Sequence, residues 1–375
     1  MLFNVCALYI KIMNNENQTI HKSDDNLTIY GWNEKLNQLK QESIYSALAH
    51  GRVSIVHRTC YEVISGNGLF QCELTGNMMY GKSDDELPCT GDWVIFQPFD
   101  EHKGIIVDRL PRERTLYRKK SGTVADKQVI ASYVDKAFIV QSLDDNFNVR
   151  RVERFMVQIM EENISSVLVL NKADLDFDRQ SVEEQIKHIS SQIPVFFTSI
   201  HQLETIVRLR KSISEGETVV FVGSSGIGKS SLVNALCEKS VLLTSDISLS
   251  TGKGRHTSTR REMVLMDSSG VLIDTPGVRE FGLAIDNPDS LAEVLEISDY
   301  AESCRFKDCK HINEPGCAVI EAVNSGALDS KVYESYLKLR REAWHFSASE
   351  HEKRKKEKSF TKLVEEVKNR KDANR

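Results

Sequence analysis

The sequence predicts a multidomain protein made of an N-terminal β-barrel, a central α/β domain and a small C-terminal helical module. Three observations support this fold class. Short alternating apolar runs, separated by turn residues, fill residues 52–108 and are typical of a small barrel. After Arg112, apolar strands alternate with amphipathic helices, the pattern of a largely parallel sheet covered by helices. Beyond Asn287 the chain reads as helical and contains a cluster of cysteines and a histidine.

Length and composition are those of an ordinary globular protein. The 375 residues, with 40% hydrophobic and 27% charged content, suffice for two or three packed domains. The formal net charge of -5 gives no overall nucleic-acid signature, so an RNA contact requires a local basic surface.

The first residues do not predict a membrane protein. Residues 1–13 begin apolar but contain Lys11, lack a small-residue cleavage site and are shorter than a membrane span. We interpret them as a frayed or mis-assigned start, with Met13 as an alternative initiator. No other run approaches the roughly 20 apolar residues of a spanning helix. We therefore expect a cytoplasmic protein without a membrane partner.

The barrel is expected within residues 51–112. Its candidate strands cover residues 53–56, 61–64, 69–74 and 93–96. The preceding residues, 1–50, form an extension in which residues 34–48 have helical spacing. We expect this helix to pack on the barrel.

The α/β domain is expected within residues 113–286. Its candidate strands cover residues 136–140, 166–170, 194–197, 218–222 and 271–273. Candidate helices between them include residues 152–162, 181–190 and 229–236. The outline is that of a nucleotide-binding architecture, but a fold alone proves no function.

A phosphate-binding loop lies between the strand at 218–222 and the helix at 229–236. Residues 223–230 fit G-x-x-x-x-G-K-[ST] in the strand–loop–helix context that confirms a P-loop. Glycines let successive backbone N–H groups and the helix N-terminus face phosphate oxygens. Lys229 would reach the β and γ oxygens, and Ser230 would ligate Mg²⁺. The predicted phosphate-binding residues are Gly223, Ser224, Ser225, Gly226, Ile227, Gly228, Lys229 and Ser230.

The tetrapeptide Asn171, Lys172, Ala173 and Asp174 indicates guanine. It fits N-K-x-D and follows the strand at 166–170. The carboxylate of Asp174 would accept hydrogen bonds from guanine N1 and the exocyclic amine, a donor pair that adenine does not present. Discrimination is strong because the wrong base leaves buried polar groups unpaired.

A third motif, Asp274 to Gly277, matches D-x-x-G, whose Asp holds Mg²⁺ through water and whose Gly senses the γ-phosphate. In Ras-like GTPases the P-loop precedes N-K-x-D, whereas here Asn171 precedes Gly223. A sheet can be permuted without moving its loops, because they stay at the carboxyl ends of the same strands. We therefore expect a circularly permuted GTPase domain. The permutation also suggests that the segment after Asp274 couples the γ-phosphate loop to a C-terminal module.

Residues 252–260 are polar and glycine-rich, which suits a mobile switch loop. One of its hydroxyl residues would complete the Mg²⁺ shell: Thr257, Ser258 or Thr259. Ras-like enzymes orient water with a Gln directly after the D-x-x-G glycine, but that position is Val278 here. Intrinsic hydrolysis should therefore be slow, or another residue must replace the Gln. Lys229 and His256 are the catalytic candidates. For His256, the alternatives are a phosphate-facing or a solvated histidine.

The cluster Cys304, Cys309, His311 and Cys317 has the spacing C-x4-C-x-H-x5-C. Such ligands suit a closed tetrahedral Zn²⁺ site, which is structural because no position remains for water. The alternative is unrelated thiols beside a surface histidine. All eight cysteines are expected to be reduced. Five stand singly and are expected to be small buried hydrophobic residues: Cys6, Cys60, Cys72, Cys89 and Cys237.

The C-terminal part is expected to divide into the helical zinc-binding module, residues 287–342, and a polar basic tail, residues 343–375. The tail carries a basic run at residues 353–356. It is either a solvated helix or an RNA-binding arm.

These motifs together resemble the RsgA (YjeQ) family of circularly permuted GTPases, which act in maturation of the bacterial small ribosomal subunit. The resemblance extends from about Gly51 to Leu339. Besides the nucleotide motifs and the Cys/His cluster it includes residues 91–94 (Gly-Asp-Trp-Val), 110–114 (Leu-Pro-Arg-Glu-Arg) and 128–131 (Gln-Val-Ile-Ala).

The resemblance implies an OB-fold barrel that contacts ribosomal RNA, guanine binding by Asn171, Lys172 and Asp174, and phosphate binding that extends to Ser231. It also implies zinc at the Cys/His cluster, His256 as the catalytic residue, and a slow GTPase stimulated by the small subunit. One departure concerns Ser199: the family usually has a guanine-contacting Ser-Ala, and this chain has Thr-Ser-Ile at residues 198–200.

Two other functions remain open on the sequence. One is a GTP switch acting on a partner other than the ribosome, and the other is a passive RNA-binding zinc protein with a degenerate GTPase domain. The intact Lys229, Ser230 and Asp274 argue against the second. For the leading function we expect a monomer whose partners are the small ribosomal subunit, its rRNA and other assembly factors.

Overall fold

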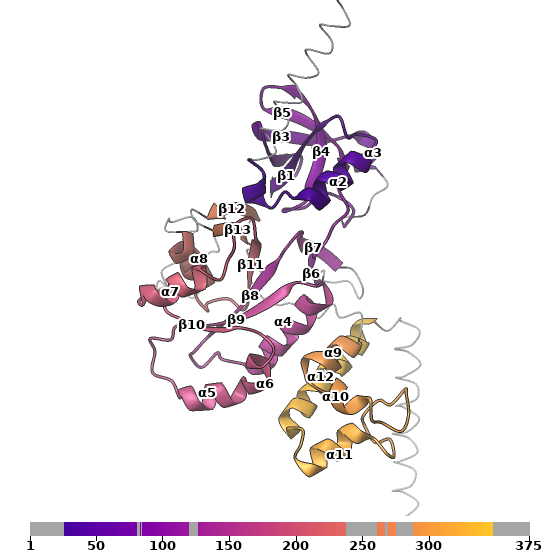
Figure 1. The fold of residues 1–375 in the computed structure, drawn as a ribbon, viewed down its shortest axis with the longest axis vertical. Coiled ribbons are helices and arrows are strands. Elements are labelled where there is room, and N and C mark those ends of the chain that lie inside the picture. The colour runs from indigo at the N-terminus through magenta and orange to yellow at the C-terminus, as the bar shows by residue number, and fades with distance from the viewer. Residues whose placement is uncertain are drawn as a thin grey trace, which may run out of the picture. The chain divides into compact units, whose positions relative to one another are not determined.

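The structure is a computed structural model that describes residues 26–80, 83, 85–119, 127–237, 261–266, 269–274 and 288–347 (Figure 1). The chain divides into two compact units. One comprises Met1–Arg118 with Lys127–Phe281, and the other comprises Lys119–Asp126 with Gly282–Arg375. Among these described residues, none of the helices combines the length and the apolar character needed to cross a membrane.

The N-terminal barrel of the first unit is closed and five-stranded (Figure 1). Its strands are β1 (Ala49–Val56), β2 (Tyr61–Ser65), β3 (Gly68–Leu74), β4 (Trp93–Asp100) and β5 (Lys103–Arg109), with the short helix α3 (Gly76–Met79) after β3. The order β1-β2-β3-β5-β4 closes by pairing of β4 with β1, and only β3 and β5 run parallel. The predicted barrel is confirmed, with an OB-like strand order.

Strand β5 was not predicted, because Gly104 reads as a turn residue in the sequence. In the barrel this glycine is needed for packing instead. A Cβ at Gly104 would lie 2.7 Å from the ring of Phe96 and 3.0 Å from the sulfur of Cys72. Phe96 and Cys72 are both fully buried, so neither can move aside.

The extension before the barrel carries a 3-10 turn (Thr28–Tyr30) and the helix α2 (Glu34–Glu42). Asn33 caps α2, since its Oδ1 accepts a hydrogen bond from the N–H of Leu36 at 3.1 Å. Leu36 then packs in a buried cluster with Trp93 of the barrel. The helix is shorter than the predicted 34–48, because Ser43 after it has extended backbone with a ψ of 144°.

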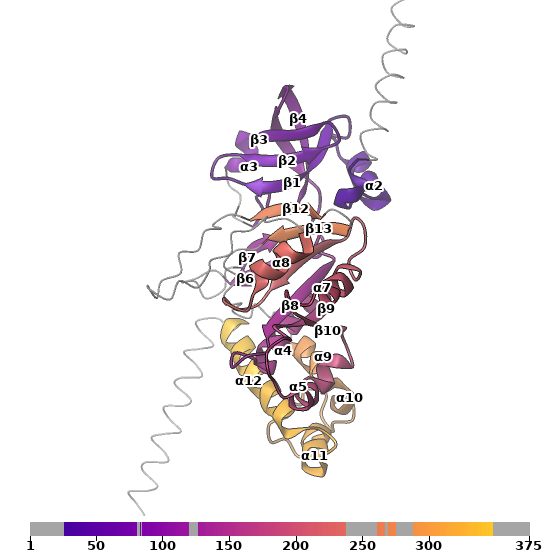
Figure 2. The ribbon, with the colours of Figure 1, turned by 90° about the vertical axis from the view of Figure 1, so that its left-hand side faces the viewer.

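The α/β part contains a mostly parallel sheet in the order β10-β9-β8-β11-β13-β12. Its strands are β8 (Lys136–Ser142), β9 (Ser165–Asn171), β10 (Val195–Thr198), β11 (Thr218–Val222), β12 (Glu262–Met266) and β13 (Ser269–Asp274). All five predicted strands are present, and β12, antiparallel to β13, is added to them. β12 also lies beside β1 of the barrel, as Figure 2 shows. The two strands pair through Ile55 and Glu262.

Helices cover both faces of this sheet (Figure 1). Helices α7 (Leu203–Arg210) and α8 (Lys229–Cys237) lie on one face, where their apolar residues share a core with β8, β9 and β11. Helix α4 (Val149–Glu161) lies on the other. The predicted helix at 181–190 is divided into α5 (Arg179–Gln185) and α6 (Lys187–Ser190). A separate two-stranded ribbon joins β6 (Leu116–Lys119) and β7 (Lys127–Ala131).

The barrel is joined to the α/β sheet by Arg52 of β1, which is almost completely buried. Its guanidinium donates to the carbonyl of Gly91 at 3.0 Å, to the hydroxyl of Thr218 at 2.9 Å and to the carbonyl of Tyr133 at 3.4 Å. It also donates to the carbonyl of Tyr30. One side chain therefore connects the N-terminal extension, the barrel and the first residue of β11.

A buried ion pair fixes the loop that leads into β4. Asp92 is fully buried and receives hydrogen bonds from Arg112 Nε at 2.9 Å and Nη2 at 2.7 Å. Arg112 also donates to the carbonyls of Asp85 and Leu87. Two of the sequence stretches that carry the family resemblance, residues 91–94 and 110–114, thus meet in one structural contact.

Residues 288–347 of the second unit form helices and their connections. Its helices are α9 (Pro288–Val294), α10 (Ser298–Ala301), α11 (Ala318–Ser325) and α12 (Ser330–Ser347). The Cys/His cluster lies in the connection from α10 to α11. The predicted domain boundaries at residues 50, 112, 286 and 342 stay predictions.

Replacing Asp92 by Asn should destabilise the first unit by about 3–5 kcal/mol, because it leaves the guanidinium of Arg112 without its buried counter-charge. The control is Asp100→Asn, which breaks the exposed ion pair with Lys103 (3.7 Å). That change should cost less than about 1 kcal/mol. Denaturant unfolding followed by tryptophan fluorescence measures both, because Trp32 and Trp93 lie in the adjoining cluster. Equal effects of the two substitutions would contradict the role given to Asp92.

Candidate functional site

The parallel strands bring the three nucleotide motifs to one edge of the sheet. β9 ends at Asn171, which is aligned with Ser142 at the end of β8. β8 is in turn aligned with β11, which runs into the glycine-rich loop at Gly223. On the other side of β11, strand β13 ends at Asp274. The motifs are permuted along the chain, yet they occupy neighbouring strand ends, as the sequence predicted.

The glycine-rich loop has the backbone that phosphate binding requires. Gly223, Gly226 and Gly228 have φ values of 146°, 82° and 88°, a region that favours glycine. Helix α8 begins directly after them, at Lys229. The ammonium of Lys229 donates to the carbonyls of Gly223 at 2.7 Å and Ser224 at 2.5 Å, so it lies folded over the loop. The first N–H groups of an α-helix have no partner within the helix and can bind phosphate oxygens.

The N-K-x-D loop is attached to this glycine-rich loop through Asn171. The side chain of Asn171 is buried and donates from Nδ2 to the carbonyl of Ile227 at 2.9 Å. Its Oδ1 accepts from the hydroxyl of Thr198 at 3.2 Å. Gly228 has to be a glycine here, since a Cβ would lie 2.6 Å from Asn171 Nδ2. The first residue of the motif thus fixes the distance between the two loops.

Lys172 adds a second connection. Its backbone has a φ of 62°, and its ammonium lies 2.8 Å from Asp144 Oδ2 and 3.3 Å from the carbonyl of Gly226. Burial raises the pKa of the Asp144 carboxyl, but the hydrogen bonds from Lys172 and Ser142 outweigh burial and hold the pKa well below its usual range. Asp144 is therefore ionised at neutral pH. Asp144 belongs to none of the motifs identified in the sequence, although its place just beyond the end of β8 was a signal.

Asp174 is exposed and faces Ser199. The hydroxyl of Ser199 donates to Asp174 Oδ1 at 2.5 Å, and this hydrogen bond lowers the pKa of the Asp174 carboxyl. The N–H of Ala173 donates to the carbonyl of Thr198 at 3.0 Å, which holds the two loops together. Ser199, whose role the family pattern left uncertain, is thus placed beside the carboxylate expected to recognise guanine. The site residues that the structure describes are brought together.

Some candidate residues lie outside the described part of the chain. They are His256, Thr257, Ser258, Thr259, Gly277 and Val278. Of the expected Mg²⁺ ligands, Ser230 is exposed in the first turn of α8 and Asp274 is half-buried at the end of β13. The proposed coupling of the loop after Asp274 to the C-terminal module therefore stays a prediction.

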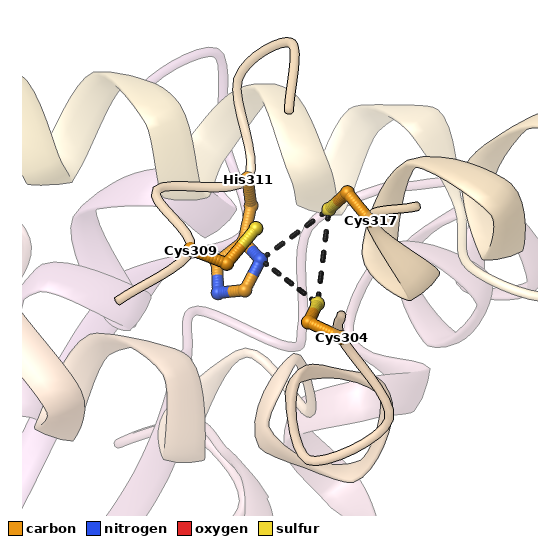
Figure 3. A group of neighbouring side chains, drawn as sticks. All are labelled: Cys304, Cys309, His311 and Cys317. Carbon is orange, nitrogen blue, oxygen red and sulfur yellow. Dashed lines mark hydrogen bonds between the residues drawn. The ribbon is translucent and has the colours of Figure 1, made fainter. Parts of the chain in front are cut away.

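The Cys/His cluster is assembled in the second unit (Figure 3). The ligand atoms of Cys304, Cys309, His311 and Cys317 all lie within 4.8 Å of one another, so the four residues could hold a metal ion. The Sγ atoms of Cys304 and Cys317 are 3.8 Å apart, and Nδ1 of His311 lies 3.5 Å and 3.4 Å from them. A tetrahedron with Zn–S bonds of about 2.3 Å has S–S edges of about 3.8 Å. The spacing fits that geometry.

The surrounding residues hold this cluster in place. Burial raises the pKa of the Cys304 thiol, but backbone N–H groups of Val319 and Ala318 at the start of α11 outweigh burial and lower it overall. Glu314 accepts hydrogen bonds from the N–H groups of Lys310 at 3.1 Å, Ile312 at 2.9 Å and Asn313 at 3.1 Å. The ligand loop is therefore shaped by its own backbone contacts as well as by its ligands. Glu314 was missed because a single Glu gives no signal in a sequence.

Of the singly placed cysteines that the structure describes, Cys72, Cys89 and Cys237 are buried thiols outside any disulfide, as expected, while Cys60 is half-buried. Cys6 lies outside the described residues. Burial raises the pKa of Cys72 and of Cys89 to about 12, so both are unreactive thiols at neutral pH.

Curated proteins with similar sequences carry one name. A relative from Bacteroides thetaiotaomicron, called small ribosomal subunit biogenesis GTPase RsgA 1, is 76% identical over 359 residues, which cover 96% of this chain and 99% of the relative. A small ribosomal subunit biogenesis GTPase RsgA from Methanosarcina acetivorans is 38% identical over 338 residues, or 87% of this chain and 89% of the relative.

Solved structures agree with the fold. The crystal structure of YjeQ from Thermotoga maritima matches with a TM-score of 0.61 and 25% identity, covering 79% of this chain and 98% of that one. The structure of YloQ, described as a circularly permuted GTPase, matches with a TM-score of 0.60 and 21% identity over 80% of this chain and 97% of that one. At that identity the second match concerns the fold alone.

Two family models match the chain. The model of the ABC transporter family matches residues 206–371, a range that includes the P-loop sequence found in many nucleotide hydrolases. The model of the RsgA GTPase family matches residues 109–284, which contain all three nucleotide motifs. With these motifs in permuted order on one sheet edge, and with full-length relatives of that name, the chain belongs to the RsgA GTPase family.

Proposed function

We propose that this protein is a GTPase that binds the small ribosomal subunit through rRNA and assists its late maturation. The observation that carries the nucleotide half of the proposal is the junction of the two loops. Asn171 donates to Ile227 and Lys172 donates to Gly226, so the guanine loop and the phosphate loop form one site. The printed names of the relatives support the ribosomal half.

Each part of the site has a proposed role. Asp174, held by Ser199, recognises the two guanine donors, while Asn171 and Lys172 fix the loop. The phosphates are bound by Lys229 and by backbone N–H groups of the loop from Gly223 to Ser231.

The proposed Mg²⁺ site uses Ser230 directly and Asp274 through water. Mg²⁺ keeps several waters and prefers oxygen ligands, which the exposed hydroxyl of Ser230 in the first turn of α8 and the half-buried carboxylate of Asp274 at the end of β13 provide. Gly277 would sense the γ-phosphate. His256 is the proposed catalytic residue, because Val278 cannot orient water. Hydrolysis should accordingly be slow until the subunit binds.

The remaining proposals concern the binding partners, the cellular location, the oligomeric state and the C-terminal tail. The small subunit is the proposed partner, so the cytoplasm is the proposed place of action. A monomeric state, contacts with other assembly factors and an RNA-binding role of the tail at residues 343–375 stay predictions.

We expect GTP turnover by the purified protein to be slow, to exceed ATP turnover and to rise on addition of small ribosomal subunits. Lys229→Ala should lower it at least about 100-fold, because it removes a cation from the developing phosphate charge. Lys211→Ala, which changes an exposed lysine at the end of α7, is the control and should leave turnover unchanged. Turnover that subunits do not alter would favour the alternative of a switch with another partner.

The glycines of the P-loop allow a matched pair of substitutions. Gly226 and Gly228 both have positive φ, but a Cβ at Gly226 meets nothing within 4 Å. Gly226→Ala should therefore show only the backbone cost of about 1–2 kcal/mol. Gly228→Ala should in addition displace Asn171 and weaken guanine-nucleotide affinity more than about tenfold beyond Gly226→Ala. Titration of a fluorescent GDP analogue measures the affinity of both variants. Equal affinities of the two variants would contradict the proposed role of the contact between Asn171 and the P-loop.

We further propose that the Cys/His cluster binds one structural Zn²⁺ ion. Purified protein should contain about one zinc per chain, and a chelator should remove helical signal from the second unit while GDP binding persists. Cys309→Ser should lose the metal, whereas Cys60→Ser, at a single half-buried cysteine, should retain it. Metal analysis and far-UV circular dichroism report the two effects. Zinc retained in full by Cys309→Ser would contradict the ligand set.

A further inference from the structure

Asp144 lies just beyond the end of β8 and outside every nucleotide motif identified in the sequence. Its two carboxylate oxygens have different partners. Oδ1 accepts from the hydroxyl of Ser142 at 2.6 Å and from the N–H of Asn146 at 3.0 Å. Oδ2 faces the ammonium of Lys172 at 2.8 Å. One oxygen therefore shapes the turn after β8, and the other is available to the guanine loop.

The ammonium of Lys172 is fixed by two partners. The ammonium is held between Asp144 Oδ2 and the carbonyl of Gly226 in the P-loop. The side chains of Lys172 and Asp144 keep 34% and 24% of their surface exposed, respectively, so the pair is partly shielded from water. Lysine has a flexible four-carbon stem, and its ammonium stays in one place only where partners fix it.

The contact has a consequence for the whole nucleotide site. Lys172 follows Asn171, the other residue that connects the guanine loop to the P-loop. Its backbone lies in the left-handed region at a φ of 62°, which a residue other than glycine adopts only at some cost. An anchored side chain offsets that cost and holds the loop in the conformation that presents Asp174. Loss of the anchor should therefore be felt as weaker nucleotide binding.

We propose that Asp144 is a positioning residue for guanine-nucleotide binding, which acts through Lys172 by fixing its ammonium against the Gly226 carbonyl. This inference rests on the proposed function of the same site. It assigns Asp144 to affinity and not to the hydrolytic step, because the contact lies at the guanine side of the P-loop and away from Asp274.

The first test compares Asp144→Asn with Asp145→Asn. The neighbouring Asp145 is exposed and takes no part in the site, so its substitution controls for the loss of one negative charge. Asp144→Asn should weaken binding of a fluorescent GDP analogue on the order of tenfold and raise KM for GTP to match. Its kcat should stay within about twofold of the parent. Asp145→Asn should change neither constant.

A double-mutant cycle separates positioning from general loop structure. If Asp144 acts through Lys172, then Asp144→Asn should have little further effect on GDP affinity in a Lys172→Ala background. Equal losses in both backgrounds would overturn the proposal, as would unchanged or tighter binding in the single variant. A fall in kcat without a change in affinity would overturn it too.

Folding and the parent activity are controlled separately. If thermal unfolding shows that the Asp144→Asn protein is not folded, the variant Ser142→Ala is tested in its place. That substitution removes one hydrogen bond from Asp144 and should weaken GDP affinity by a smaller factor in the same direction. No loss of affinity in folded Ser142→Ala would then overturn the proposal. If the parent protein binds no guanine nucleotide, the proposed function itself fails, and the first titration shows that before any variant is compared.

Discussion

The guanidinium of Arg52 is the contact on which the arrangement of the first unit depends. Burial lowers the pKa of this side chain to about 10, with the carboxylate of Asp135 opposing the shift, so the group stays charged at neutral pH. A buried charge needs hydrogen bonds in several directions, and here the partners come from four segments of the chain, at Tyr30, Gly91, Tyr133 and Thr218. These hydrogen bonds fix the position of the barrel relative to the sheet. Gly91 completes the joint, because a Cβ there would lie 2.4 Å from the carbonyl of Ser132.

That joint also explains how a permuted sheet can begin where it does. β8 is the first strand of the α/β part, and it is entered from the barrel and its linker. Asp135, the residue before it, exchanges two hydrogen bonds with Thr218: its N–H donates to the carbonyl at 2.8 Å, and its carboxylate accepts from the N–H at 2.7 Å. Because the Thr218 hydroxyl also accepts from Arg52, the starts of β8 and β11 are fixed to the barrel. The strand ends that carry the motifs then follow from parallel pairing alone.

The sequence predicted what depends on local pattern. Five apolar strands, the P-loop sequence and the Cys/His cluster each have a periodicity or spacing that identifies them, and all are present where expected. Features that depend on distant partners were not predicted. Gly104 reads as a turn until Phe96 is seen to fill the space beside it, and the short strand β12 is recognised only by its pairing with β13. In the site, Asp144 was missed and the role of Ser199 was left uncertain, because their roles depend on Lys172 and Asp174, which lie 28 and 25 residues away in the chain.

Two structural connections of different length link the barrel to the strand ends that carry the nucleotide motifs. Through Thr218 the route follows β11 along its five residues, or roughly 17 Å of strand, before it meets the P-loop. The connection through β12 is shorter than the one along β11. Ile55 of the barrel is paired with Glu262, and Glu262 is paired with Asp274, so two strand spacings of about 4.8 Å separate the barrel from the proposed Mg²⁺ carboxylate. A movement of the barrel would therefore reach Asp274 most directly through β12, which is paired with the barrel at Ile55 and Glu262.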